Sequence, residues 1–157
     1  MGAFDRWRRG PIRRVDDDRY VIELDEHLRA LIGGLVEDLR ALIETDDPRL
    51  FRLFPPPYGD DEERNQGYAV LAGAELRERR IESLEVVSAH LDATELDGEQ
   101  LSAWMRSIND VRLVLGTSLG ITDDGQEPPS DPSDVAIHTV YELLGVLLES
   151  IVQALSE

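Results

Sequence analysis

Apolar residues that recur every three or four positions constrain the fold of this chain more than any other feature. In the segment DEHLRALIGGLVEDLRALIE, leucine and isoleucine fall at spacings that line one face of a helix, and charged residues occupy the other face. Asp25 stands where an N-cap residue accepts a hydrogen bond from the first turn. The segment therefore predicts an amphipathic helix over residues 25–45, whose apolar face must pack against other elements.

Two further segments show the same periodicity. Residues 60–91 are predicted to be helical, with a break or bend near Gly73. Residues 97–119 are predicted as a helix with Asp97 as its cap and Gly120 as its stop.

The last predicted helix covers residues 132–155 and is the most apolar of the set. Its main apolar stripe is broad, and Leu143 and Val146 point away from it. A helix that is apolar on two sides lies at the centre of a bundle or forms part of a subunit interface. Leu143 and Val146 are therefore candidate interface residues.

Two short runs near the N-terminus predict a β-hairpin. Ile12–Val15 and Arg19–Leu24 alternate in polarity and flank a turn-prone DDD sequence, so the hairpin spans residues 12–24. Two strands alone are only marginally stable, and this ribbon must lie on other elements. The expected fold class is mainly α: a helical bundle of about four to five helices with a short N-terminal β-hairpin.

Length and composition favour one domain over residues 1–157. A chain of 157 residues with 41% hydrophobic residues can build a single core. Cysteine is absent, which excludes disulfides, thiolate metal sites and cysteine nucleophiles. Lysine is also absent, which excludes Schiff-base catalysis and a phosphate-binding P-loop lysine.

The charge is strongly acidic and unevenly distributed. The net charge is −17, but the first 14 residues hold five arginines and one aspartate, a net +4, which leaves −21 on the remainder. This basic segment could contact nucleic acid or pair with acids of the same chain, and we expect the second. The five arginines are Arg6, Arg8, Arg9, Arg13 and Arg14.

The chain shows no sign of membrane insertion or export. No apolar run approaches the roughly 18 residues that span a bilayer, and the N-terminus has no apolar signal segment. We therefore expect a cytoplasmic location.

Three segments resemble a known family. WMRSINDVRLVLGTSLGIT, RYVIELDE and VYELLGVLLESIVQAL are similar, in this order, to an actinobacterial family catalogued as domain of unknown function two-zero-one-seven. An arginine often occupies the position of Ser118 in that family. The residues that carry the resemblance are Trp104, Arg106, Asn109, Asp110, Gly116 and Gly120.

The resemblance implies a context but no chemistry. The family has no established activity, and its genes commonly neighbour that of the Clp protease adaptor ClpS and often a small sulfur-carrier system with its metalloprotease. Some members carry the label of transcriptional regulator. These associations favour a regulatory or adaptor role.

Motifs for catalysis or metal binding are missing. His27, His90 and His138 are isolated, without the spacing of a zinc site. No GxSxG nucleophile elbow occurs, and the acidic loops lack the ligand order of a calcium loop. We expect no enzyme activity, no cofactor and no metal.

Two arginines fall at core edges of their helices. On a helical wheel, Arg112 borders the apolar sector of residues 97–119 with Asn109 beside it, while Asp110 faces nearly the opposite way and is expected outside. Arg80 is placed similarly in its own helix. A buried guanidinium must be paired.

Two hypotheses account for this pair of arginines. In the first, both have their heads in water or bound to carboxylates of the same chain. In the second, Arg80, Asn109 and Arg112 share a polar pocket that receives a carboxylate or phosphate of a ligand or partner.

The favoured function is a non-enzymatic cytoplasmic protein that acts through protein–protein contact in a regulatory or adaptor role. A Clp-system component is a candidate partner, and a homodimer through the last helix is a second expectation. The alternatives are a nucleic-acid-binding regulator that uses residues 1–14 and a binder of a small anionic ligand. No helix combines basic residues with a helix-turn-helix pattern, so we expect no nucleic-acid binding.

Overall fold

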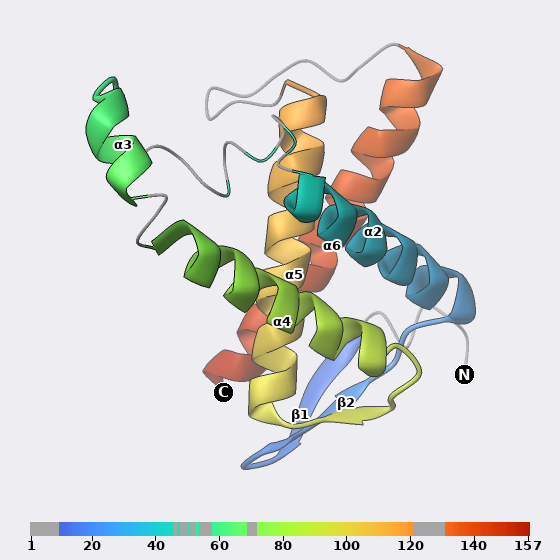
Figure 1. Ribbon diagram of the computed structural model, residues 1–157. Helices are drawn as coiled ribbons and strands as arrows, with labels where there is room; N and C mark the ends of the chain where they lie inside the picture. Colours follow the sequence, from blue (N-terminus) through green and yellow to red (C-terminus); the bar gives the residue numbers. More distant parts are fainter. Residues whose placement is uncertain are drawn as a thin grey trace.

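The computed structural model describes residues 10–45, 47, 50, 53, 58–68, 72–120 and 131–157. Within them the chain forms five α-helices and a small antiparallel sheet of three strands, which confirms the mainly α class with an N-terminal hairpin (Figure 1). The elements are β1 Ile12–Asp16, β2 Arg19–Ile22, α2 Glu26–Thr45, α3 Glu62–Tyr68, α4 Ala74–Ala89, β3 Glu95–Leu96, α5 Gly98–Ser118 and α6 Pro132–Ser156.

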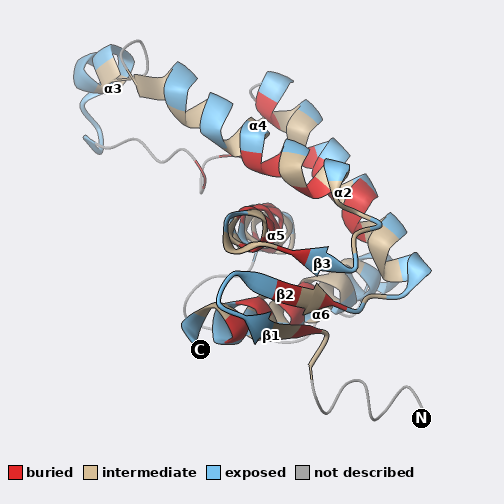
Figure 2. Ribbon diagram, turned by 90° about the horizontal axis from the view of Figure 1, so that it is seen from below, coloured by how far each residue is buried: buried red, intermediate tan, exposed pale blue. Residues whose placement is uncertain are grey.

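Helix α5 is the centre of the fold. Seen end-on in Figure 2, it lies between a layer that holds α2 and α4 and a layer that holds the sheet and α6. It contacts α2, α4, α6 and β2, and the side chains of Leu101, Trp104 and Ile108 are almost fully buried. Because neighbours cover α5 on several sides, it buries residues over more than half of its circumference, and Arg106 and Asn109 lie on the exposed remainder.

The start of α5 carries the predicted cap and ties it to α4. Asp97 and Gln100 form a reciprocal capping box, each side chain accepting from the backbone N–H of the other. The Gln100 amide also lies 3.1 Å from Nε2 of His90. Nδ1 of the same ring lies 2.8 Å from the Val86 carbonyl oxygen. His90 is therefore a connector between the end of α4 and the cap of α5.

The sheet contains one strand beyond the predicted hairpin. β1 and β2 pair antiparallel, and β3 pairs with the other edge of β2, with Tyr20 opposite Leu96. β3 has only two residues, too few for a recognisable alternation. Its pairing makes β2 the central strand and supplies the support that an isolated hairpin lacks.

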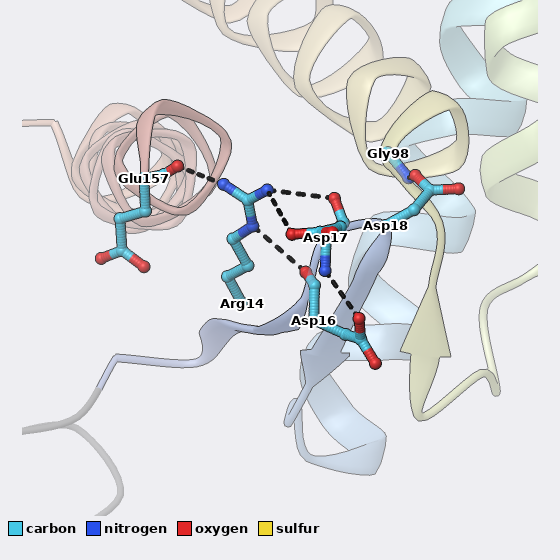
Figure 3. Close-up of polar contacts among 6 residues, drawn as sticks. All are labelled: Arg14, Asp16, Asp17, Asp18, Gly98 and Glu157. Atoms are coloured by element: carbon cyan, nitrogen blue, oxygen red, sulfur yellow. Dashed lines mark hydrogen bonds and ion pairs between the residues drawn. The ribbon is translucent and has the colours of Figure 1, made fainter.

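The hairpin turn is fastened to both neighbouring helices (Figure 3). Oδ1 of Asp18 accepts from the Gly98 N–H at 2.8 Å, so the turn adds a second carboxylate to the start of α5. Arg14 donates to two carbonyl oxygens of the turn and to that of Glu157. The same short loop thus joins the first residue of α5 to the end of α6.

The segment predicted as one broken helix over residues 60–91 is two helices, α3 and α4. Ala72 and Gly73 form a short π-helical stretch that leads directly into α4, and Gly73 has helical backbone angles. Residues 69–71, between α3 and this stretch, lie outside the described residues. Leu91 packs closely on α2 at Gly33. A Cβ at position 33 would lie 2.8 Å from Cδ1 of Leu91. Gly33 thus permits close packing of the segment after α4 on α2.

Arg29 in α2 holds three segments together, and among the described residues it has no acidic partner. Its Nε donates to the Leu24 carbonyl at 2.9 Å. Nη1 donates to the carbonyls of Leu91 and Ala93, and Nη2 to that of Ile22. The end of β2, the start of α2 and the α4–β3 connection therefore meet at one guanidinium.

Helix α6 has the length and apolar composition of a membrane span. Core helices of soluble proteins share this composition, and here Leu144, Leu147, Ile151 and Ala154 are buried against the rest of the chain. Only 17% of the most apolar window is buried, however. One side of α6 thus belongs to the core and another side is open.

We predict that Arg29→Met destabilises the fold by about 1–3 kcal/mol, because it leaves several part-buried carbonyl groups without a donor. Arg29→Lys does not restore the loss, since an ammonium cannot reproduce the planar fork. The measurement is urea unfolding followed by circular dichroism. Arg40→Met is the control: within the described part of the chain, Arg40 pairs with Glu44 and Glu85 at the surface, and its loss is expected to cost under about 1 kcal/mol. Equal losses for the two methionine variants would contradict a structural role for Arg29.

Candidate functional site

A groove of about 980 Å³ lies between α4 and α5. We call it the α4/α5 groove. Its floor is partly apolar and its walls carry charged groups of both signs. The polar residues on which its chemistry depends are Arg79, Arg80, Ser83, Arg106, Asn109 and Asp110.

A buried ion pair forms part of the groove wall. Nη1 of Arg80 lies 2.6 Å from Oδ1 of Asp110, whose side chain is 7% exposed. Nη2 of Arg80 donates to the Leu53 carbonyl at 3.1 Å. Burial raises the pKa of the Asp110 carboxyl above its ordinary value of 3.8, and the hydrogen bond and charge of Arg80 and the charge of Arg106 offset part of that rise.

The predicted outward orientation of Asp110 is wrong. The helical wheel correctly separates Asp110 from Arg112, but it assumes that α5 has one buried face. Because α4 covers the side of α5 opposite to α6, that side is also interior, and Asp110 is only 5% exposed. Its partner Arg80 comes from α4. Arg80 is therefore bound to a carboxylate of the same chain, as in the first hypothesis.

Arg106 has unused hydrogen-bonding capacity in the groove. Its Nε donates to Oγ of Ser83 at 3.1 Å, and Ser83 is 7% exposed. Among the described residues, the two terminal nitrogens of Arg106 have no hydrogen-bond or ion-pair partner. Arg79, by contrast, pairs with Glu75 at 2.6 Å. Ser83 therefore orients the fork of Arg106 while its terminal donors stay free.

Sequence reasoning did not select Arg106 or Ser83 as site residues. Two helical spacings could have indicated them: Arg106 lies four positions before Asp110 on α5, and Ser83 lies three positions after Arg80 on α4. Each pair shares a helix face, so the contact between Arg80 and Asp110 brings the other two together.

The three predicted site residues do not share a pocket. Arg80 and the exposed Asn109 both line the α4/α5 groove. Arg112 lies against α6 instead, where its Nε donates to the Tyr141 carbonyl at 3.2 Å and its guanidinium sits 4.3 Å from the centre of the Tyr141 ring. Arg112 therefore does not belong to the predicted three-residue pocket.

Gly145 makes room for Arg112. A Cβ at position 145 would lie 2.9 Å from Nη2 and 3.1 Å from Cζ of Arg112. The guanidinium thus lies across α6 at its glycine, with an aromatic ring and a backbone carbonyl as partners. Arg112 joins α5 to α6, and its contacts are structural.

Leu143 and Val146, the predicted interface residues, both lie on α6 away from the core. Leu143 is half-buried, and Val146 is 49% exposed. Within the described part of the chain, no group of three histidine, aspartate or glutamate side chains could hold a metal ion.

The predicted basic segment is partly engaged by the chain itself. Arg13 pairs with Glu23 at 2.7 Å, and Arg14 lies within 4.0 Å of an Asp17 carboxylate oxygen. Arg6, Arg8 and Arg9 lie outside the described residues.

The raised pKa of Asp110 predicts how stability changes with pH. The folded chain holds this proton to a higher pH than the unfolded chain, so the unfolded state binds fewer protons between the two pKa values and stability falls as pH rises through that interval. Asp110→Asn removes this loss. Relative to wild type, the free energy of unfolding of the Asn variant is therefore expected to rise from about pH 4 upward and to level off above the folded pKa.

Urea unfolding at a series of pH values measures this difference. Arg80→Met is the matched comparison, because it removes the group that lowers the pKa of Asp110 and so widens the interval over which stability falls. Parallel stability curves for wild type and Asp110→Asn would show that Asp110 titrates alike in the folded and unfolded chain.

Gly145→Ala is predicted to have opposite effects in two backgrounds. In wild type, the substitution gains about 1 kcal/mol in helix propensity. It also displaces Arg112, which loses a stacking contact and a hydrogen bond worth about 1–2 kcal/mol together. The net effect in wild type is therefore neutral or destabilising. In Arg112→Ala, nothing is displaced and the same substitution stabilises by about 1 kcal/mol. Thermal unfolding of the four proteins of this cycle gives the coupling. An equal effect in both backgrounds would contradict the close packing of Arg112 on Gly145.

The comparisons with known proteins agree with the resemblance found in the sequence. The family described as Domain of unknown function (DUF2017) matches residues 1–155. The protein named oxidative stress regulator AosR of Mycobacterium tuberculosis (strain ATCC 25618 / H37Rv) is 28% identical over 96% of this chain and 87% of its own length. The protein of the same name from Mycobacterium bovis shows the same identity and coverage. No solved structure gives a significant match.

Proposed function

The chain belongs to the family Domain of unknown function (DUF2017), and we propose that it is a regulatory protein that acts by binding another protein. The regulatory part of the proposal is supported by its similarity to proteins named as regulators. Binding through the α4/α5 groove is supported by the geometry of its arginines.

The observation that carries the proposal is the oriented, half-used guanidinium of Arg106. Its Nε is held by the buried Ser83, and the terminal donors remain available to a carboxylate, which a guanidinium binds in a bidentate manner. Of the other two groove arginines, Arg80 is neutralised by Asp110 and Arg79 pairs with Glu75, so both are less available. Arg106 is therefore the point at which a partner's acidic side chain would bind.

The arginines of the groove are confined to one part of it, which favours a peptide segment over a single small anion. Asp97 and Glu99 line the end at the start of α5, and the three arginines line the region further along, together with Glu82 and Asp110. A partner segment with a basic residue at one end and a carboxylate at the other would match both. Such complementarity sets orientation and specificity more than affinity.

We propose a non-enzymatic role because the buried hydroxyl and the buried carboxylate of the groove are both engaged by arginines. The Ser83 hydroxyl accepts from Arg106 instead of facing a histidine base, and the Asp110 carboxylate is paired with Arg80. The proposal includes a cytoplasmic location. The gene neighbourhood implied by the family resemblance makes the ClpS adaptor and other Clp-system components the first partners to test.

The absence of cysteine shapes what a role in oxidative stress would involve. Proteins usually detect oxidants through low-pKa thiols, and these 157 residues contain two methionines and no cysteine. A response of this chain to oxidant would therefore come through a partner or through methionine oxidation. This supports a role in protein–protein contact.

We predict that Arg106→Ala weakens partner binding by roughly tenfold or more, the effect of losing a charged hydrogen-bonding contact at a binding site. The test is affinity capture from native lysate with purified Clp components as named candidates, quantified by mass spectrometry. Arg64→Ala is the matched control, because it removes the same charge from the exposed helix α3, away from the groove. Both variants should keep the melting temperature of wild type.

Equal capture of every partner by wild type, Arg106→Ala and Arg64→Ala would remove the groove from the proposal. Stabilisation of wild type, but not of Arg106→Ala, by free anionic metabolites in a thermal shift assay would instead favour a small-ligand site.

A further inference from the structure

The open side of α6 presents a continuous uncharged stripe. Its members follow one another at spacings of three or four residues, as along a helix–helix seam. Val135 and Val146 are 44% and 49% exposed. In a chain with 31% charged residues, six successive surface positions without a charge are unusual. We call this face the α6 outer stripe; it consists of Val135, Thr139, Leu143, Val146, Ser150 and Gln153.

The two flanks of the α6 outer stripe carry opposite charges. Glu142 and Glu149 lie about 60° from the stripe on one side of the helix. β1 lies along the other side, as Figure 2 shows, and Gly10 at its start approaches Ser150. β1 brings Arg13 to this flank.

The acidic and basic flanks meet at the same level along α6. A hollow of about 560 Å³ is lined by Arg13 and Arg14 from β1 and by Val146 and Glu149 from α6. Arg13 is 39% exposed beside its partner Glu23, so it remains accessible from outside. A surface that approaches the stripe therefore meets acids on one side and arginines on the other.

From this arrangement we propose that the α6 outer stripe binds a second copy of the same chain, with the two α6 helices parallel. A two-fold axis that runs along the helices places the acidic flank of each copy opposite the arginine flank of its partner. A two-fold axis across the helices makes them antiparallel and places the acidic flank of each copy opposite the acidic flank of its partner. Opposite charges favour the parallel pair, and like charges disfavour the antiparallel pair.

This dimer leaves the α4/α5 groove free, because α5 separates α6 from α4 (Figure 2). The inference therefore stands apart from the proposed partner binding. One helix face with a strand edge is smaller than the roughly 800 Å² per partner of a standard interface, so we expect a dissociation constant in the micromolar range.

Single cysteine substitutions give a direct test, since the chain contains no other cysteine. In a parallel pair, equal positions face each other across the axis at every level of the stripe. Thr139→Cys and Val146→Cys, two helical turns apart, should therefore each form disulfide-linked dimers under mild oxidation at concentrations on the order of 100 μM. Val152→Cys is the control: Val152 is 45% exposed on another side of α6, and this variant should form no disulfide-linked dimer.

Sedimentation equilibrium supplies a measurement that does not depend on oxidation. Wild type should show a reversible monomer–dimer equilibrium, and Val146→Glu should weaken it by roughly tenfold or more, since it adds an acid to the centre of the seam. Val152→Glu adds the same charge outside the seam and should leave the equilibrium unchanged. Circular dichroism verifies that both variants are folded.

Several outcomes would overturn the proposal. A chain that stays monomeric at the highest concentration has no such dimer. An antiparallel pair is shown if Thr139→Cys cross-links with Gln153→Cys in a mixed sample and if Thr139→Cys and Val146→Cys do not both link to themselves. Monomeric Val146→Cys can also be labelled with maleimide. If labelling is slow and becomes fast when residues 1–9 are removed, those residues cover the stripe. Co-sedimentation of the monomer with phosphatidylcholine vesicles, lost in Val146→Glu, assigns the stripe to a lipid surface.

Discussion

The structure depends on a helix that is buried on more than one side. α5 packs against α6 and the sheet on one side and against α2 and α4 on the other, so only the sector of its central part that holds Arg106 and Asn109 is open to solvent. Asp110 on the α4 side is therefore tolerable only with Arg80 opposite it. Arg112 on the α6 side is tolerable only because a glycine and an aromatic ring accommodate it. Both contacts hold outer helices against the central one.

Arginine, the only basic side chain of this protein apart from histidine, binds the backbone as readily as it binds acids here. Arg29 donates to four carbonyl oxygens, Arg14 to three and Arg112 to one. A guanidinium presents several fixed donors in one plane, which suits it to gather carbonyl groups where chain segments end. In a protein of net charge −17, much of its positive charge is thus used to join elements. The partly free fork of Arg106 differs from this pattern.

Features set by neighbouring residues were predictable from the sequence, and features set by distant contacts were not. The helices, the cap at Asp97 and the hairpin depend on spacing and on local hydrogen bonds, and they are found where the pattern indicated. The pairing of β3 depends on a partner strand far away in the sequence. The orientation of Asp110 required knowledge of how many neighbours α5 has. Of the three residues of the predicted pocket, Arg80 and Asn109 line the α4/α5 groove, whereas Arg112 lies on the side of α5 that faces α6.

The contact between Arg14 and Glu157 constrains the order in which the chain can assemble. These residues are 143 positions apart, so the hairpin turn cannot reach its final attachment until α6 has been synthesised to its last turn. During synthesis, β1 and β2 can pair locally, and α2, α4 and α5 can pack. The edge of β1 stays uncovered until α6 has been made. Contacts of such long separation close late because they carry the largest loop entropy. The hairpin that is made first is therefore expected to be the part of the fold that docks last.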